Sequence, residues 1–277
     1  MKYTLKNVTF LMLAMLAVIG FSCSSDDNDK DPVEADTSIV VDVSEVNQKF
    51  EDLDNLTLAI LENSGLGARK TTSFSGDFCA TTEFDYQDDQ KTIIVDFGDG
   101  CVSPNGISRK GKIKLVYSGS LLIPGATIVT TFEGYEVNGY KVEGTRTLTN
   151  VGLNIITQTV TIAVKVENGK ITWPDGGVVS INSDQERVIV LEDTGYDATI
   201  SGTLSGTSKD GSPFSATITD NLKITQSCVE SGVYNPISGL IDFTYKNVKM
   251  TLDYGTGDCD KKATVTYPGG VKEINFD

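Results

Sequence analysis

The chain has 277 residues, with 38 acidic and 23 basic side chains, a formal net charge of −15 and no histidine. Without histidine, this chain cannot use Ser-His-Asp or Cys-His catalysis or imidazole-ligated metal and haem sites. The acidic excess also argues against a nucleic-acid partner, because affinity for phosphates comes from clustered Lys and Arg. The length is enough for one large domain or two small ones.

Residues 1–22 predict a signal peptide. Lys2 and Lys6 precede an apolar run from Phe10 to Phe21, which has the length of a signal-peptide core and is short for a membrane span. Cys23 follows directly, a spacing that resembles a bacterial lipoprotein signal and implies cleavage before Cys23 and acylation of its thiol. The alternative is an ordinary secretory signal. We favour lipidation because the remaining chain already has an even number of cysteines, four.

Residues 23–41 predict an acidic, disordered tether, because small polar residues cannot bury apolar surface. Directly after Cys23, the chain resembles the export signal of surface lipoproteins of the Bacteroidota type, in the residues Ser24, Ser25, Asp26, Asp27 and Asp29. The resemblance implies attachment to outer-membrane lipid through acylated Cys23 and exposure at the cell surface. The alternative is a simple spacer.

Residues 42–64 predict an amphipathic helix. Apolar residues recur every three or four positions and form one stripe, made of Val43, Val46, Phe50, Leu53, Leu56 and Ile60. Asp42 and Glu45 have the spacing of a capping box. We expect the stripe to pack on the following sheet, since a helix this short is marginal alone. A stalk or partner helix at the membrane is the alternative.

Residues 77–277 predict a mainly β domain, an antiparallel meander of about a dozen strands. Apolar residues alternate with polar ones in 159–166 and 214–219, which is typical of half-buried strands. Turns are predicted at Asn138-Gly139, Asn168-Gly169, Asp210-Gly211, Asp175-Gly176-Gly177 and Gly269-Gly270. So long a meander must curl, close or fold over, so we expect a large curled sheet or a sandwich with one N-terminal helix.

The four remaining cysteines predict two local disulfides. The segment 92–101 resembles 250–259: each has a strand, then Asp-aromatic-Gly, then an acidic Gly loop ending in Cys. Each is also preceded by a segment that bears a Cys. The simplest account is a divergent duplication, with halves at 77–150 and 151–277 and with bridges Cys79–Cys101 and Cys228–Cys259 in an oxidising compartment.

The acidic loops raise the question of a metal. Asp96 and Asp99 in one loop, and Asp253 and Asp258 in the other, offer oxygen ligands of the kind that calcium prefers. Their spacing does not match a known calcium loop, and tight turns use Asp and Gly without any metal. We therefore expect no metal and no cofactor, with these residues as weak calcium candidates.

No catalytic motif stands out. The 38 acidic residues offer many carboxylate pairs for glycoside hydrolysis but select none, and there is no phosphate-binding or dinucleotide-binding glycine loop. We therefore expect a protein that is not an enzyme. Aromatic residues in turn-like segments are the candidates for stacking on a sugar or anchoring a protein: Trp173, Tyr135, Tyr140 and Tyr196. The alternative for each is packing in the core.

In overall pattern, the lipobox, acidic tether and Cys-bearing β repeats look like surface lipoproteins of the Bacteroidota type to which no activity is assigned. We expect a lipid-anchored, surface-exposed β scaffold that binds a glycan or protein or interacts with the cell envelope. Two alternatives remain open. One is a carbohydrate-binding or sugar-handling component of a surface uptake system. The other is a structural or adhesive envelope protein.

Overall fold

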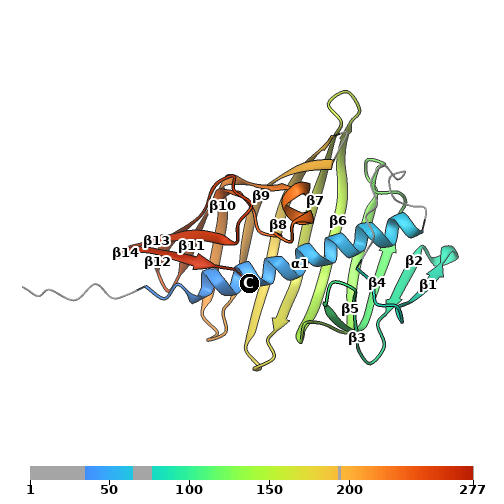
Figure 1. The fold of residues 1–277 in the computed structure, drawn as a ribbon, viewed down its shortest axis with the longest axis horizontal. Helices are drawn as coiled ribbons and strands as arrows, with labels where there is room; N and C mark the ends of the chain where they lie inside the picture. Colours follow the sequence, from blue (N-terminus) through green and yellow to red (C-terminus); the bar gives the residue numbers. More distant parts are fainter. Residues whose placement is uncertain (1–34, 65–76, 193–194, 277) are drawn as a thin grey trace, which may run out of the picture. The chain divides into compact units, whose positions relative to one another are not determined.

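A computed structural model of the chain describes residues 35–64, 77–192 and 195–276, which belong to one structural unit, Glu34–Asp277 (Figure 1). The predicted signal peptide (1–22), Cys23 and the export segment lie outside the described residues. The helices are α1 (Ser38–Asn63), α2 (Gln226–Glu230) and the short 3-10 helix η1 (Asp88–Gln90). The strands are β1 (Glu83–Gln87), β2 (Thr92–Asp96), β3 (Cys101–Val102), β4 (Ser108–Tyr117), β5 (Thr127–Val137), β6 (Tyr140–Asn154), β7 (Thr159–Thr172), β8 (Val178–Glu192), β9 (Gly195–Thr207), β10 (Pro213–Thr225), β11 (Ser238–Tyr245), β12 (Val248–Thr256), β13 (Lys262–Tyr267) and β14 (Gly270–Asn275).

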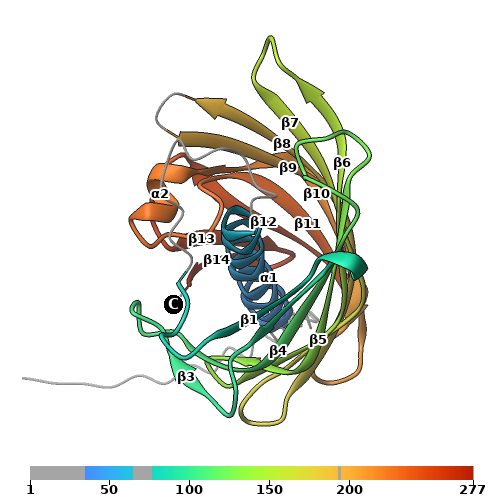
Figure 2. The ribbon, with the colours of Figure 1, turned by 90° about the vertical axis from the view of Figure 1, so that its right-hand side faces the viewer.

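All strands belong to one antiparallel sheet of 14 strands, and neighbours in the sheet are neighbours in the chain. Only β3 departs from this order, since it pairs with β4 beside β2. The sheet does not close: among the described residues, β1 and β14 are its two edges. Figure 2 shows the sheet curled around helix α1. The predicted fold class, an antiparallel meander forming a curled sheet with one N-terminal helix, is confirmed.

Glycines lie at positions where the register between neighbouring strands shifts. Gly144 has a φ of +115° and lies at the register shift between Glu143 and Thr145. Gly202 has a φ of +131°, and a Cβ there would lie 2.2 Å from the backbone oxygen of Asp184. Only glycine adopts this backbone without strain, and bulges of this kind increase local bending. The glycines therefore allow the long strands to curve around the helix.

Four of the five predicted turns are confirmed. Asn138 and Gly139, with φ of 49° and 79°, connect β5 to β6, and the other three connect β7 to β8, β9 to β10 and β13 to β14. The prediction at Asn168-Gly169 is wrong. These residues lie within β7, at a register shift against β8 between Val166 and Gly169. Asn168 has the positive φ of a turn, 53°, but a bulge requires that conformation too.

Helix α1 lies on the concave side of the sheet, and its side chains share one hydrophobic core with the strands. The six residues of the predicted stripe are all buried. The sheet also covers positions outside the stripe, since Ser44 and Thr57 are buried as well. Because strands face the helix on several sides, its polar residues need partners inside the curl.

The helix begins at Ser38, inside the segment predicted to be a disordered tether. Ile39 and Val40 are fully buried, and this burial explains why the helix extends below residue 42. The predicted capping box is wrong: Asp36 accepts from the Ser38 backbone N–H at 3.2 Å, while Asp42 and Glu45 make other contacts. Neither α1 nor α2, within the described residues, is long and apolar enough to cross a membrane.

Both predicted disulfides are confirmed. Cys79 bonds to Cys101 in β3, and Cys228 in α2 bonds to Cys259 in the loop after β12. The repeated Asp-aromatic-Gly segments also share a local geometry. In each, the Asp side chain accepts a hydrogen bond of 2.8 Å from the Gly N–H, and the aromatic side chain between them is buried: Asp96 to Gly98 around Phe97, and Asp253 to Gly255 around Tyr254. The likeness is local, and duplication of the whole halves remains a hypothesis.

Candidate functional site

A cavity of about 240 Å³ lies between the second half of α1 and strands β6–β10. We call it the inner cavity. Apolar side chains form most of its wall: Leu58, Leu61, Leu121, Leu122, Leu148, Val160, Ile162, Val164, Ile189, Leu191, Ala198, Ile200 and Ile224. Five polar residues complete it: Glu51, Asp54, Asn55, Arg187 and Tyr196.

The alternation of inward and outward side chains along the strands determines which residues form the apolar wall of the inner cavity. In β7, Val160, Ile162 and Val164 occupy successive inward positions, and the intervening side chains are less buried. Residues from the two neighbouring strands meet these in register, because Ile189 of β8 pairs with Val160 and Leu148 of β6 pairs with Val164. The wall is therefore a continuous apolar surface on the concave face of the sheet.

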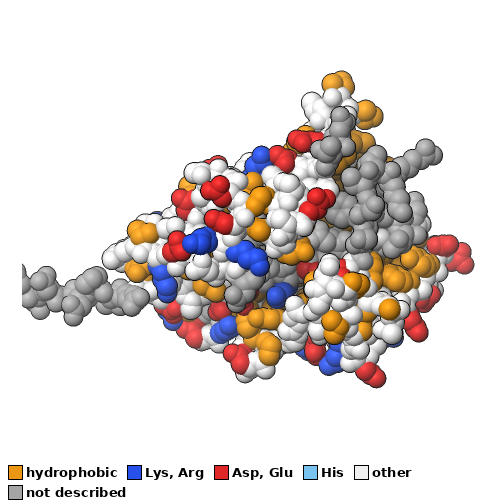
Figure 3. All heavy atoms as spheres, viewed as in Figure 1, with side chains coloured by type: hydrophobic (Ala, Val, Ile, Leu, Met, Phe, Trp, Pro, Cys, Tyr) orange, Lys and Arg blue, Asp and Glu red, His pale blue; other side chains and the backbone are white. Residues whose placement is uncertain are grey.

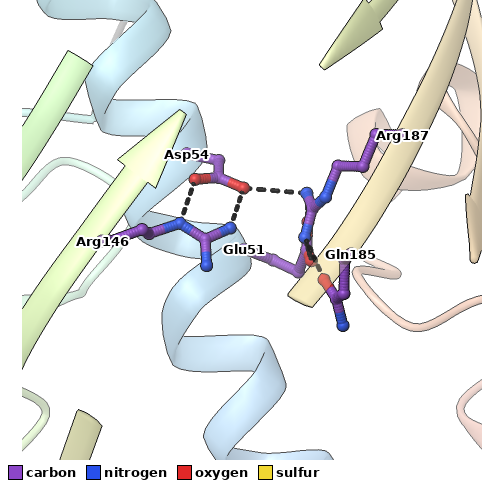
Figure 4. A network of polar contacts seen from close by, with 5 residues as sticks. All are labelled: Glu51, Asp54, Arg146, Gln185 and Arg187. Atoms are coloured by element: carbon purple, nitrogen blue, oxygen red, sulfur yellow. Dashed lines mark hydrogen bonds and ion pairs between the residues drawn. The ribbon is translucent and has the colours of Figure 1, made fainter. Parts of the chain in front are cut away.

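Arginines from two strands reach the helix beside the inner cavity (Figure 4). Arg146 of β6 donates to both carboxylate oxygens of Asp54, at 2.7 Å and 2.5 Å. Arg187 of β8 donates to both oxygens of Glu51, at 2.5 Å and 2.9 Å, and also to Asp54 at 2.8 Å. Two carboxylates thus share two guanidinium groups, in the bidentate geometry that favours strong pairing.

A third arginine joins the helix further along the sheet. Arg109 of β4 donates to both oxygens of Asp52, at 2.5 Å and 2.8 Å, and to the Tyr135 hydroxyl at 2.8 Å. Burial alone would lower the pKa of Arg109, but the bonds to Asp52 outweigh it and raise that pKa above its usual value. Burial raises the pKa of Tyr135 above its usual range. The Arg109 cation and the neutral Tyr135 hydroxyl are therefore stable partners.

The charged network beside the inner cavity is balanced: the carboxylates of Glu51 and Asp54, which line the cavity, match the guanidinium groups of Arg187, which also lines it, and of Arg146 behind it. The side chain of Arg187 is 11% exposed and that of Asp54 is 14% exposed. These carboxylates are already occupied by guanidinium donors. The network can hold the helix against the sheet and gives one end of an apolar cavity a polar character without a net charge.

The aromatic ligand candidates lie inside the curl. Trp173 is 7% exposed, and its indole N–H donates to Glu45 at 2.9 Å, while Tyr135 is fully buried. The turn predicted after Trp173 is present, since Gly176 donates to the Trp173 carbonyl at 2.9 Å, but the side chain points into the core. These two side chains pack in the core, which was the alternative to ligand binding.

The other two candidates differ from each other. Tyr140 is half-buried, meets the Trp173 ring edge-on at 5.6 Å and carries the Lys49 ammonium 4.4 Å from its ring centre. Tyr196 lines the inner cavity. Burial, together with the nearby Glu51 carboxylate, raises the pKa of Tyr196 to about 12, so its hydroxyl is neutral at physiological pH. Of the four candidates, only Tyr196 faces a cavity that could hold a ligand.

The calcium candidates stay apart. Asp96 accepts from Gly98 and pairs with Lys112 at 2.8 Å, and Asp253 accepts from Gly255. Asp99 and Asp258 are exposed in their loops. Across the described residues, no group of three or more acidic or Cys side chains is placed to hold a metal ion. The ordered Asp side chains serve as turn and strand partners.

The buried arginines were absent from the sequence-based candidates. Every second side chain of β8 faces inward, and Arg187 occupies one of these positions. The others are also buried: Val179, Ile181, Ser183 and Gln185. An arginine at an apolar position of an alternating strand, with acidic residues at 51, 52 and 54 of a buried helix, was the available signal.

No family model, curated protein or solved structure matches this chain.

Proposed function

We propose that this protein is a lipid-anchored envelope protein that binds one small, mostly apolar molecule in the inner cavity. The observation that carries the proposal is the cavity itself, about 240 Å³ with an almost wholly apolar wall. Its volume is slightly below the roughly 300–1,000 Å³ of sites that hold drug-sized ligands. An acyl or isoprenoid chain of moderate length is a ligand of suitable size and chemistry.

The balance of charge beside the inner cavity restricts the class of ligand further. Because Glu51 and Asp54 are already paired with Arg146 and Arg187, a charged head group would enter without a counter-ion of its own. Burying an unpaired charge is costly, whereas a hydroxyl or carbonyl group needs only a hydrogen bond. A neutral amphiphile therefore fits better than a carboxylate, and the occupied carboxylates favour binding over catalysis.

The proposed location rests on the sequence. Acylation of Cys23 would hold the chain at outer-membrane lipid, and the acidic residues that follow favour export to the cell surface. The β scaffold would then hold its ligand next to the membrane. A sugar ligand finds less support, because Trp173 and Tyr135 are buried and carry partners within the core.

A titration of the full chain with the uncharged fluorescent probe N-phenylnaphthylamine tests the proposal. Ala198→Phe should fill part of the inner cavity, which Ala198 lines, and weaken probe affinity about tenfold or more. Ala198→Leu should have a smaller effect in the same direction. Ala80→Phe, which adds the same ring at an exposed position away from the cavity, is the matched control and should bind the probe like the native chain.

Thermal unfolding of each variant shows whether it keeps the native fold. If folded Ala198→Phe binds the probe as tightly as the native chain, the inner cavity is not the binding site. If the native chain itself shows no saturable binding, the proposed function is wrong.

A further inference from the structure

The hairpin that joins β6 to β7 carries the most exposed large apolar side chains of the described residues. Ile155 is 81% exposed and Ile156 is 95% exposed. Figure 1 shows this hairpin extending beyond its neighbours, and Figure 3 shows hydrophobic side chains at its end. Exposed apolar groups of this size usually mark a contact surface.

The turn that presents the two isoleucines is ordered. The Asn154 side chain accepts from the backbone N–H of Ile156 at 3.0 Å and of Thr157 at 3.2 Å. Leu191 of β8 donates to the Gln158 carbonyl at 2.8 Å and supports the hairpin from the side. Because these backbone groups already have partners, moving the turn out of water costs less.

The hairpin itself carries no charged side chain. Between Arg146 and Lys165 the chain has no Asp, Glu, Lys or Arg, although its net charge is −15. More partly exposed apolar side chains lie at the same end of the sheet: Ile123, Val151, Leu153, Val190 and Leu191. We call these five, with Ile155 and Ile156, the tip patch.

The tip patch is continuous with the inner cavity. Leu191 belongs to both, since it is 40% exposed and lines the cavity. Ile123 follows Leu121 and Leu122 of the cavity wall, and Gly125 of the same loop donates to Asn150 of β6 at 2.7 Å. If this end of the sheet entered an apolar phase, that phase would contact the wall of the inner cavity.

We propose that the tip patch inserts into the surface of a neutral lipid bilayer, with Ile155 and Ile156 entering the acyl region. A narrow turn with two protruding side chains cannot provide the roughly 800 Å² per partner of a typical protein interface. A bilayer requires only apolar atoms without unpaired polar groups. The absence of charge fits a zwitterionic surface, which does not repel this acidic chain. This inference goes beyond the proposed ligand binding and does not depend on it.

The test uses the full chain with phosphatidylcholine vesicles that carry bromine on the acyl chains. Ile156→Trp places a fluorophore at the tip, and the native chain, whose only tryptophan is the buried Trp173, gives the baseline. Bromine quenches only nearby rings, so the readout is local even if the N-terminal segment also holds the chain on the vesicle. We expect the emission of the added tryptophan to fall about twofold or more, as for a ring at the acyl boundary.

Val271→Trp is the matched control, because Val271 is an exposed apolar residue, at 66%, on β14. It should not be quenched. Adding Ile155→Asn to Ile156→Trp should reduce the quenching, while probe binding in the inner cavity stays unchanged. The proposal is overturned if Ile156→Trp is not quenched on vesicles that hold the chain, which would leave a protein as the partner of the tip patch. Equal quenching at positions 156 and 271 would also overturn it.

Discussion

The guanidinium group of Arg187 on β8 holds both carboxylate oxygens of Glu51 on α1, at 2.5 Å and 2.9 Å, inside the curl of the sheet. Arg187 lies near the middle of its strand and Glu51 near the middle of the helix. This pair, with Arg146–Asp54 and Arg109–Asp52, fixes the rotation of the helix relative to the sheet. The same rotation leaves the inner cavity beside the second half of α1.

Replacing Arg187 with Met should destabilise the protein by about 3 kcal/mol, because the largely buried carboxylate of Glu51, 20% exposed, loses its partner. The double variant Glu51→Leu/Arg187→Met should regain most of that loss, since a matched apolar pair leaves no buried charge. Urea unfolding of the native chain, the single variants Arg187→Met and Glu51→Leu, and the double variant measures both effects. As a control, Lys262→Met removes the exposed pair with Glu273, where the side chains are 55% and 59% exposed, and should cost less than about 1 kcal/mol.

Each disulfide should contribute comparable stability. The sequence separations are 22 residues for Cys79–Cys101 and 31 residues for Cys228–Cys259, and for these the chain-entropy relation gives roughly 3–4 kcal/mol each. Paired Cys→Ala variants should therefore lower the unfolding free energy by similar amounts, slightly more for the longer loop. Urea unfolding with and without a reducing agent measures this. A bridge whose removal leaves the midpoint unchanged would contradict the expectation for that bridge.

Gly202→Ala should weaken the curvature of the sheet. The added Cβ would lie 2.2 Å from the Asp184 backbone oxygen, at a φ of +131° that alanine rarely adopts. We expect a loss of about 2 kcal/mol or more in unfolding free energy. Gly211→Ala also has a positive φ, +82°, but meets no atom within 4 Å, so it should cost less. Equal losses in the two variants would show that the close approach in β9 does not matter.

Alkaline pH should destabilise the fold through buried tyrosines. Burial raises the pKa of Tyr254 to about 12, against about 10 for an exposed tyrosine. The folded state therefore keeps the phenol proton more strongly than the unfolded state does. Its contribution is complete below about pH 10 and is lost as the pH rises toward 12. Unfolding free energies at intervals from pH 8 to pH 12 test this, and Tyr254→Phe should flatten part of the decline.

Local patterns were sufficient to predict the mainly β fold, the helix stripe and both disulfides. The alternation in β7 and the repeated Asp-aromatic-Gly segments depend on neighbours in the chain, and such features can be recognised in one sequence. The Asn168-Gly169 prediction failed because a turn and a bulge require the same positive φ. Only the pairing with β8 distinguishes the two, and that is a long-range property.

The site could not be predicted in the same way. The inner cavity depends on how far the sheet curls around α1, and register shifts such as those opposite Gly144 and Gly202 contribute to that curl. Trp173 was expected beside a turn, and it is, but the bond to Glu45 turns its side chain into the core. Arg146 and Asp54 are 92 residues apart, so no local pattern joins them.

The central claim is that the inner cavity holds one neutral, mostly apolar molecule. Native mass spectrometry of the full chain incubated with dodecanol tests it most directly, with Ala198→Phe measured in parallel. The account predicts a complex of one chain with one dodecanol molecule for the native protein, and a strongly reduced fraction of that complex for the variant. No complex with the native protein, or the same fraction in both, would contradict it.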